Sequence, residues 1–143
     1  MNYKSILFFL GLFLFPLSGL SFINILYSTY FDYFLSIDSY TTTFFLTLLL
    51  GCSLCFYGRN SFRKINFYEQ LLLIILVYLF SSLFISLPYY SSNYQITFLD
   101  AIFESFSGIT LTGFSIFENI KYLDPTLILW RSSSQWIGGL YFL

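Results

Sequence analysis

Long apolar runs separated by short polar turns make up most of this sequence. The runs extend from Ile6 to about Tyr30, from about Tyr40 to Tyr57, and from about Phe67 to Leu87, where Pro88 ends the third. Each has roughly the ~20 residues that a helix needs to cross a hydrocarbon core. The pattern therefore predicts three membrane-spanning helices, the first kinked at Pro16. A polar turn marked by Asp32 and Asp38 is expected between the first two.

The stretch from Thr97 to Gly113 follows a different pattern. It lies between apolar segments, yet it carries two carboxylates, several hydroxyls and two glycines, so it is too polar to span a bilayer alone. Thr97 followed by Asp100 is a capping-box pattern, and a carboxylate in the first turn suits the positive end of a helix dipole. A helix from Thr97 to Ser107 would cover about half of a ~30 Å core, and Gly108 is predicted to end it.

The four residues Thr110, Leu111, Thr112 and Gly113 would then be non-helical backbone at membrane depth. Such backbone is tolerated only where it is buried in protein or lines a watery cavity, so a re-entrant pore loop is predicted. Main-chain carbonyls aimed at an axis can replace the water shell of a cation, and Gly113 permits the positive φ that this needs. No carboxylate lies between Ser105 and Ile116, so dipoles rather than full charges would bind the ion.

Composition places the chain among integral membrane proteins. It is 57% hydrophobic, 24% aromatic and 9% charged, with a mean hydropathy of +0.77. A net charge of −1 without a basic run gives no footprint for nucleic acid, and the absence of histidine removes a histidine metal site or general base. Cys52 and Cys55 lie inside an apolar run without further metal ligands, and we interpret them as packing or lipid-facing residues.

Charge asymmetry predicts the orientation. If each run spans once, Lys4 and the cationic loop 58–64 lie on one side, and most acidic residues lie on the other. The acidic set is Asp32, Asp38, Glu118 and Asp124, with Lys121 alone opposing it. The positive-inside rule then puts the N-terminus in the cytoplasm and the entrance of the loop outside. A secretory signal peptide is an alternative for the first run, although that run continues long enough to span.

The last apolar run is predicted to begin in a helix at Pro125 and to be cut short at Leu143. Its sequence includes Trp130-Arg131 and Gln135-Trp136-Ile137-Gly138-Gly139. With Asp100 to Ser105, Gly108 and the Thr110–Gly113 segment, these residues resemble the first pore repeat of the Trk/Ktr/HKT superfamily of potassium transporters, the TrkH-type membrane subunits above all. The resemblance covers residues 66–143 well. Residues 1–64 resemble the family's additional helix pair only in arrangement and hydropathy.

The resemblance implies an all-α integral membrane fold: two N-terminal membrane helices in residues 1–64, then one helix, pore loop and truncated helix in residues 65–143. Family members are similar to four fused potassium-channel subunits around one pore. By this resemblance Thr110, Leu111, Thr112 and Gly113 form one wall of a selectivity filter for potassium, and no cofactor is needed. The implied partners are potassium, the remaining three pore repeats, a second copy in a homodimer, and a cytosolic nucleotide-binding TrkA-type subunit. The implied location is the bacterial inner membrane.

Two residues depart from the family pattern. Leu111 stands where a threonine is common, which backbone chemistry should tolerate. Tyr141 stands where a further glycine would follow Gly138 and Gly139, and it leaves the inner packing of the last helix open.

Several polar and small residues have two interpretations. Asp100 and Glu104 lie four apart on one helix face, where they either attract cations to the pore mouth or cap the helix and pair with Arg131. Arg131 is expected to pair with Glu104 or Glu118, because an unpaired charge in a membrane helix is costly. Gly138 and Gly139 are either a hinge or a close-packing patch.

Two other functions remain open from the sequence. A homotetrameric cation channel would need only one loop per chain. An intramembrane enzyme would use Asp100 and Glu104 as a carboxylate pair, although no nucleophile or metal site accompanies them. The leading interpretation is a potassium uptake subunit.

Overall fold

The computed structural model describes residues 3–33, 37–59, 65–92 and 94–142. In chain order its helices are α1 (Tyr3–Tyr30), α2 (Ile37–Gly58), α3 (Phe67–Tyr90), α4 (Phe98–Ile109), the short 3₁₀ helix η2 (Ile120–Tyr122) and α5 (Pro125–Phe142). Helices α1, α2 and α3 are each long and apolar enough to cross a membrane. The predicted all-α membrane fold is confirmed.

Two prolines lie inside the long helices. Helix α1 continues through Pro16 from Tyr3 to Tyr30. Helix α3 was expected to end at Pro88, but it ends at Tyr90. Backbone hydrogen bonds close the turn beyond the proline: the Ser91 N–H donates to the Leu87 carbonyl oxygen, and the Ser92 N–H donates to the Tyr89 carbonyl oxygen. Asp38, expected in a turn, lies in the first turn of α2, where a carboxylate favours the helix dipole.

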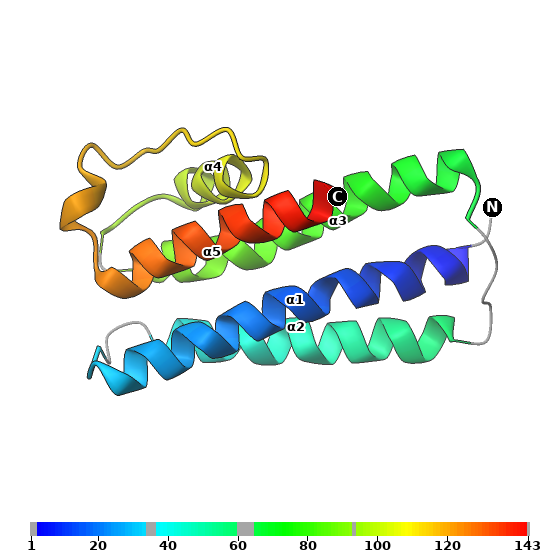
Figure 1. Ribbon diagram of the computed structural model, residues 1–143, viewed down its shortest axis with the longest axis horizontal. Coiled ribbons are helices and arrows are strands. Elements are labelled where there is room, and N and C mark those ends of the chain that lie inside the picture. Colours follow the sequence, from blue (N-terminus) through cyan, green and yellow to red (C-terminus); the bar gives the residue numbers. More distant parts are fainter. Residues whose placement is uncertain (1–2, 34–36, 60–64, 93, 143) are drawn as a thin grey trace.

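Helices α1 and α2 form an antiparallel pair along their whole length (Figure 1). Glycines bring the two backbones close. A Cβ added to Gly11 would lie 2.8 Å from the Gly51 carbonyl oxygen, and one added to Gly58 would lie 2.6 Å from the Lys4 carbonyl oxygen. Small residues at such crossings let membrane helices gain van der Waals contact that larger side chains would prevent. Cys55 also lies here, with its thiol donating to the Phe8 carbonyl oxygen across 3.6 Å.

Trp130 joins the α1–α2 pair to the other helices. Its side chain is 1% exposed, its indole N–H donates to the Ile85 carbonyl oxygen of α3 at 3.0 Å, and its ring centroid lies 5.4 Å from that of Tyr40 in α2. Both rings belong to a core that also contains Leu17 of α1. A buried indole N–H needs an acceptor, and this bond fixes how α5 lies against α3.

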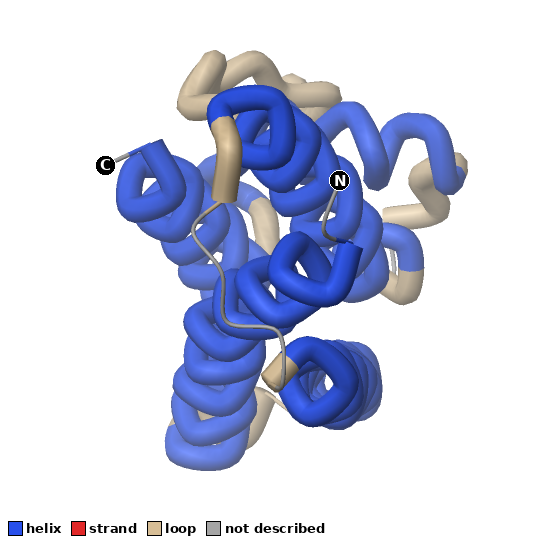
Figure 2. Tube along the Cα trace, turned by 90° about the vertical axis from the view of Figure 1, so that its right-hand side faces the viewer, coloured by secondary structure: helices blue, strands red, loops and turns tan. Residues whose placement is uncertain are grey.

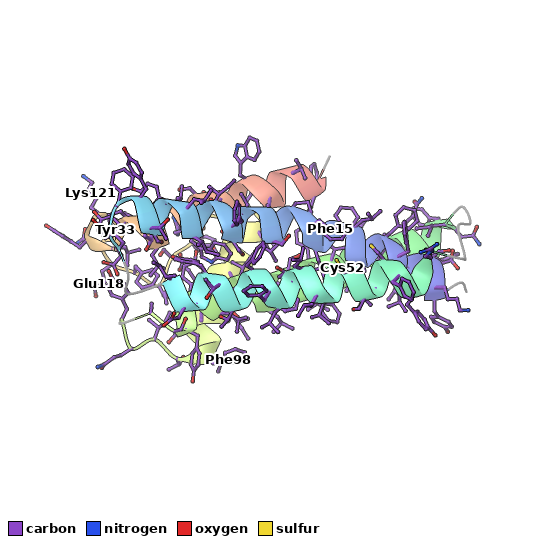
Figure 3. All side chains as sticks on the ribbon, turned by 90° about the horizontal axis from the view of Figure 1, so that it is seen from below. Phe15, Tyr33, Cys52, Phe98, Glu118 and Lys121 are labelled. Carbon is purple, nitrogen blue, oxygen red and sulfur yellow. The ribbon has the colours of Figure 1, made fainter. Side chains whose placement is uncertain are left out.

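The turns cluster at the two ends of the bundle. Helices α1 and α3 run in one direction and α2 and α5 in the other, so the starts of α1 and α3 share one end with the C-terminal end of α2 (Figure 1). Tyr33, Glu118 and Lys121 lie at the opposite end (Figure 3). Residues 60–64 of the predicted cationic loop lie outside the described residues. Arg59 of this loop stacks on Phe56, with its Cζ 5.8 Å from the centroid of the ring. Cys52 is exposed and Cys55 partly so, and neither is disulfide-bonded.

Candidate functional site

Helix α4 begins with the expected capping box. The backbone N–H of Asp100 donates to Thr97 Oγ1 at 3.2 Å, and the backbone N–H of Thr97 donates to Asp100 Oδ2 at 3.1 Å. Two N–H groups that have no partner inside the helix are satisfied in this way. Asp100 is therefore engaged in starting α4, which packs against α3 and α5. The connections before and after α4 both run to the same end of the bundle (Figure 1).

Helix α4 ends one residue later than Gly108, which was predicted to stop it. The last helical residue is Ile109, and Thr110 is the C-cap, with its N–H donating to the Phe106 carbonyl oxygen at 2.9 Å. Gly108 instead gives close packing. A Cβ at this position would lie 2.5 Å from Ser134 Oγ of α5. The end of α4 thus rests against α5 at a contact that needs glycine on one side and a small side chain on the other.

The Thr110–Gly113 segment follows α4 as non-helical backbone in which the sign of φ alternates from one residue to the next. The φ angle is −85° at Thr110, +60° at Leu111 and +77° at Gly113, and Thr112 is not among the residues with positive φ. Positive φ at Gly113 was expected, whereas at Leu111 it was not, and it costs a leucine roughly 1–2 kcal/mol. All four residues are exposed. The chain after α4 runs along the outer side of that helix (Figure 1), and Figure 2 shows loop at the outer edge of the helices.

Both threonine side chains of this segment turn back onto the last turn of α4. Thr110 Oγ1 donates to the Phe106 carbonyl oxygen at 2.6 Å, and Thr112 Oγ1 donates to the Ser107 carbonyl oxygen at 3.3 Å. Ser107 in turn donates to the Phe114 carbonyl oxygen at 2.5 Å. In the part of the chain that the structure describes, no hydrogen bond reaches the carbonyl oxygens of residues 110–112. The groups left to bind a ligand are therefore main-chain oxygens.

Glu104 and Arg131 hold the other side of the loop. Glu104 is fully buried, and its Oε1 accepts from Arg131 Nε at 2.6 Å. Its carboxylate also accepts from Ser115 Oγ at 3.1 Å and from the Ile116 N–H at 3.0 Å. Of the two carboxylates expected as partners for Arg131, Glu104 makes the contact. A carboxylate held by these three partners is a structural anchor. With Asp100 engaged at the N-cap, the two carboxylates do not form a catalytic pair.

Arg131 also reaches the Thr110–Gly113 segment. Its Nη2 donates to the Gly113 carbonyl oxygen at 3.2 Å, and its side chain is 13% exposed. The planar guanidinium can make both contacts at once because its donors diverge in a fixed fork. Arg131 therefore links α4, α5 and the loop.

The two adjacent glycines of α5 have different surroundings. A Cβ at Gly138 would lie only 2.0 Å from the Ile109 carbonyl oxygen, whereas a Cβ at Gly139 would meet only Leu111 Cδ1, at 3.9 Å. Gly138 is a close-packing residue for the end of α4. Gly139 borders a hollow of about 570 Å³ that lies beside Leu111. The hollow is lined by Leu111, Ser132, Gln135, Trp136, Gly139 and Leu140.

Sequence reasoning missed three serines that shape this site. Ser107 donates to the Phe114 carbonyl oxygen and Ser115 donates to Glu104, so both hold the C-terminal side of the exposed loop, and Ser134 contacts Gly108. Only Ser134 had a signal in the sequence, because it precedes Gly138 by four residues in the small-xxx-small spacing of close helix crossings. Among the described residues, no cluster of three or more histidine, cysteine or acidic side chains could hold a metal ion.

Comparison with known proteins places this sequence in a family context. No family model matches the chain. It is 31% identical over 103 residues to the Trk system potassium uptake protein TrkH of Escherichia coli, an alignment that covers 71% of this chain and 21% of the relative. This chain is a homologue of the Trk-type potassium uptake proteins. It is also 38% identical over 73 residues to TrkI of Halomonas elongata, covering 51% of this chain and 15% of that protein.

The Trk-type similarity extends to an archaeal relative. An uncharacterized cation transporter of Methanocaldococcus jannaschii is 31% identical over 81 residues, which are 57% of this chain and 17% of the relative. The chain thus spans about a fifth of the length of the Trk proteins it matches. These relatives are named as transporters of potassium or cations, not as enzymes.

Proposed function

We propose that this Trk-type chain contributes one wall of a potassium-conducting pore in the bacterial inner membrane. The observation that carries the proposal is the exposed Thr110–Gly113 segment, with its alternating φ and three carbonyl oxygens without hydrogen bonds among the described residues. Its relatives are named as potassium uptake proteins. Together these support potassium uptake, with main-chain oxygens of the segment as ligands.

The physical basis is the handedness of the segment. When φ changes sign from one residue to the next, successive peptide planes turn so that their N–H groups lie on one side and their carbonyls on the other. A row of carbonyl dipoles can replace the water shell of a cation without the strong attraction of a full charge. A carboxylate about 4 Å from the ion would add roughly 4 kcal/mol of attraction at an effective dielectric near 20 and would slow its exit.

The arrangement in the membrane follows from the same proposal. Helix α4 would be a re-entrant pore helix entering from the outer face, between α3 and α5 as the flanking helices, with residues 65–143 as the pore repeat and residues 1–64 as an additional helix pair. The ends that carry Lys4 and Arg59 would face the cytoplasm. The C-terminal end of α4 would then point its partial negative charge toward the centre of the membrane, where it favours a resting cation.

Further partners are proposed on the resemblance alone. Three more pore repeats would complete the ring of carbonyls, two such transporters would form a homodimer, and a cytosolic nucleotide-binding subunit of the TrkA type would gate the pore.

The test distinguishes the role of the backbone from that of the side chain at Leu111. The transporter that contains this chain is expressed in a strain deficient in potassium uptake, and rubidium uptake is measured for Leu111→Gly and Leu111→Pro. Glycine accepts φ of +60° and keeps the backbone, so uptake should persist. Proline fixes φ near −65° and removes the N–H that donates to the Gly108 carbonyl oxygen, so uptake should be lost at equal membrane abundance. Equal uptake by both variants would contradict a carbonyl-lined pore at this segment.

A further inference from the structure

The Gly113 carbonyl differs from the three carbonyls that precede it in the Thr110–Gly113 segment. It accepts a hydrogen bond from Arg131 Nη2 at 3.2 Å, whereas the carbonyls of residues 110–112 accept none among the described residues. The difference is chemical as well as geometric, because the donor is a permanent cation. A carbonyl oxygen that already accepts a hydrogen bond from a guanidinium cation is a poor ligand for a transported cation.

The guanidinium cannot easily turn away from this carbonyl. Its Nε donates to Glu104 Oε1 at 2.6 Å, and Glu104 is fully buried and held by Ser115 and the Ile116 N–H. The guanidinium of arginine is planar and rigid, so the bond that fixes Nε on one partner also fixes the direction of Nη2. Leaving Glu104 without its cation would strand a buried charge. The bond to Gly113 is therefore built into the fold of the site.

We propose that Arg131 sets the strength of ion binding in the pore: by occupying the Gly113 carbonyl it limits the ion-binding face of this wall to residues 110–112 and weakens cation binding at the position of Gly113. The inference rests on the proposed function and makes it more specific. The wall contributed by this repeat thereby binds ions less tightly than four free carbonyls would. Weaker binding at one end of the segment favours ion exit.

A neutral replacement of the ion pair tests the proposal. In the transporter that contains this chain, Glu104→Gln combined with Arg131→Met removes both charges while keeping similar volumes. The glutamine oxygen can still accept from the Ile116 N–H and its amide can donate to Ser115 Oγ, so the loop keeps its anchor. Ser133→Ala, on the same helix and outside the network, is the matched control. Rubidium uptake is measured against external rubidium concentration, with sodium as competitor.

The freed Gly113 carbonyl should tighten ion binding. We expect the KM for rubidium to fall by about three- to tenfold in the double variant, the range that corresponds to the loss of one hydrogen bond of ordinary strength. The maximal rate per transporter should not rise, and Ser133→Ala should match the wild type. A purely structural role for Arg131 would lower the number of transporters in the membrane and leave the KM and the sodium competition unchanged. That result would overturn the proposal.

A second variant decides the matter if the double variant does not reach the membrane. Arg131→Lys keeps a positive charge beside Glu104 but lacks the second donor that binds the Gly113 carbonyl oxygen, so it should also lower the KM for rubidium. An unchanged KM in this variant would overturn the proposal. The proposed function fails separately, because in that case Leu111→Gly and Leu111→Pro would take up rubidium equally or the wild-type transporter would take up none.

Discussion

The guanidinium of Arg131 binds the carboxylate of Glu104 at 2.6 Å and so joins α5 to the helix that precedes the exposed loop. The pair is nearly dry, since Glu104 is fully buried and the arginine side chain is 13% exposed. Charges in such surroundings contribute to the fold only while both are present, because either one alone keeps its desolvation cost without its partner.

Removing one member of this pair should destabilise the chain strongly. We expect Arg131→Met alone to lower the free energy of unfolding by about 3–5 kcal/mol, since Glu104 would remain buried and charged. The combined Glu104→Gln and Arg131→Met variant should recover most of that loss. Thermal unfolding of the purified protein in detergent measures both. A double variant as unstable as the single one would show that the pair is not the source of the effect.

The adjacent glycines of α5 should differ in their response to the same substitution. Gly138→Ala places a methyl group where the Ile109 carbonyl oxygen lies, so α4 and α5 must separate, at a cost of about 1–3 kcal/mol. Gly139→Ala meets only the end of the Leu111 side chain and should be close to the wild type. Melting temperature and uptake should fall for the first variant alone. Equal effects of both would contradict the close contact at Gly138.

Substitution of Gly113 should impair function because of its backbone conformation and not because of a steric clash. No atom lies within 4 Å of a Cβ built there, but φ of +77° costs a side chain roughly 1–2 kcal/mol and tilts the neighbouring carbonyls. We expect Gly113→Ser to reduce potassium uptake or selectivity, measured as growth of an uptake-deficient strain at limiting potassium. Gly19→Ser is the control, since that glycine also has open space around it but lies inside α1. Unchanged growth of the Gly113→Ser strain would speak against the prediction.

The start of α4 should depend on Thr97. Thr97→Ala removes the acceptor for the Asp100 N–H and is expected to cost about 1 kcal/mol of stability. Thr41→Ala is a suitable comparison, because Thr41 is a partly buried threonine whose hydroxyl donates to the Asp38 carbonyl oxygen within its own helix. Thermal unfolding of the two variants side by side should show the larger loss for Thr97→Ala. The reverse order would argue that the capping box does not hold α4.

The sequence predicted those parts of the fold that depend on local pattern. Hydrophobic length placed α1, α2 and α3, and the Thr97–Asp100 spacing placed the start of α4. The break after α4 was predicted at Gly108 from the low helix propensity of glycine. In the fold Gly108 lies inside the helix, and a Cβ there would lie 2.5 Å from Ser134 Oγ of α5, a tertiary contact that no local pattern reports.

The chemistry of the loop was only partly predictable. Gly113 was expected at positive φ because glycine adopts it without strain, whereas Leu111 gave no such signal. The Glu104–Arg131 pair followed from the cost of a lone charge in a membrane helix, but the bond from Arg131 to the Gly113 carbonyl required the direction of the guanidinium in space. Side-chain directions of this kind depend on how α4 and α5 pack, which spacing along the chain does not determine.

The most direct measurement is the position of a heavy alkali-metal ion in the transporter that contains this chain. Crystals or particles prepared in rubidium or thallium should show density next to the main-chain oxygens of residues 110–112, with the Gly113 carbonyl still bound to Arg131. Density confined to other segments, with these oxygens facing lipid or the protein interior, would contradict the account.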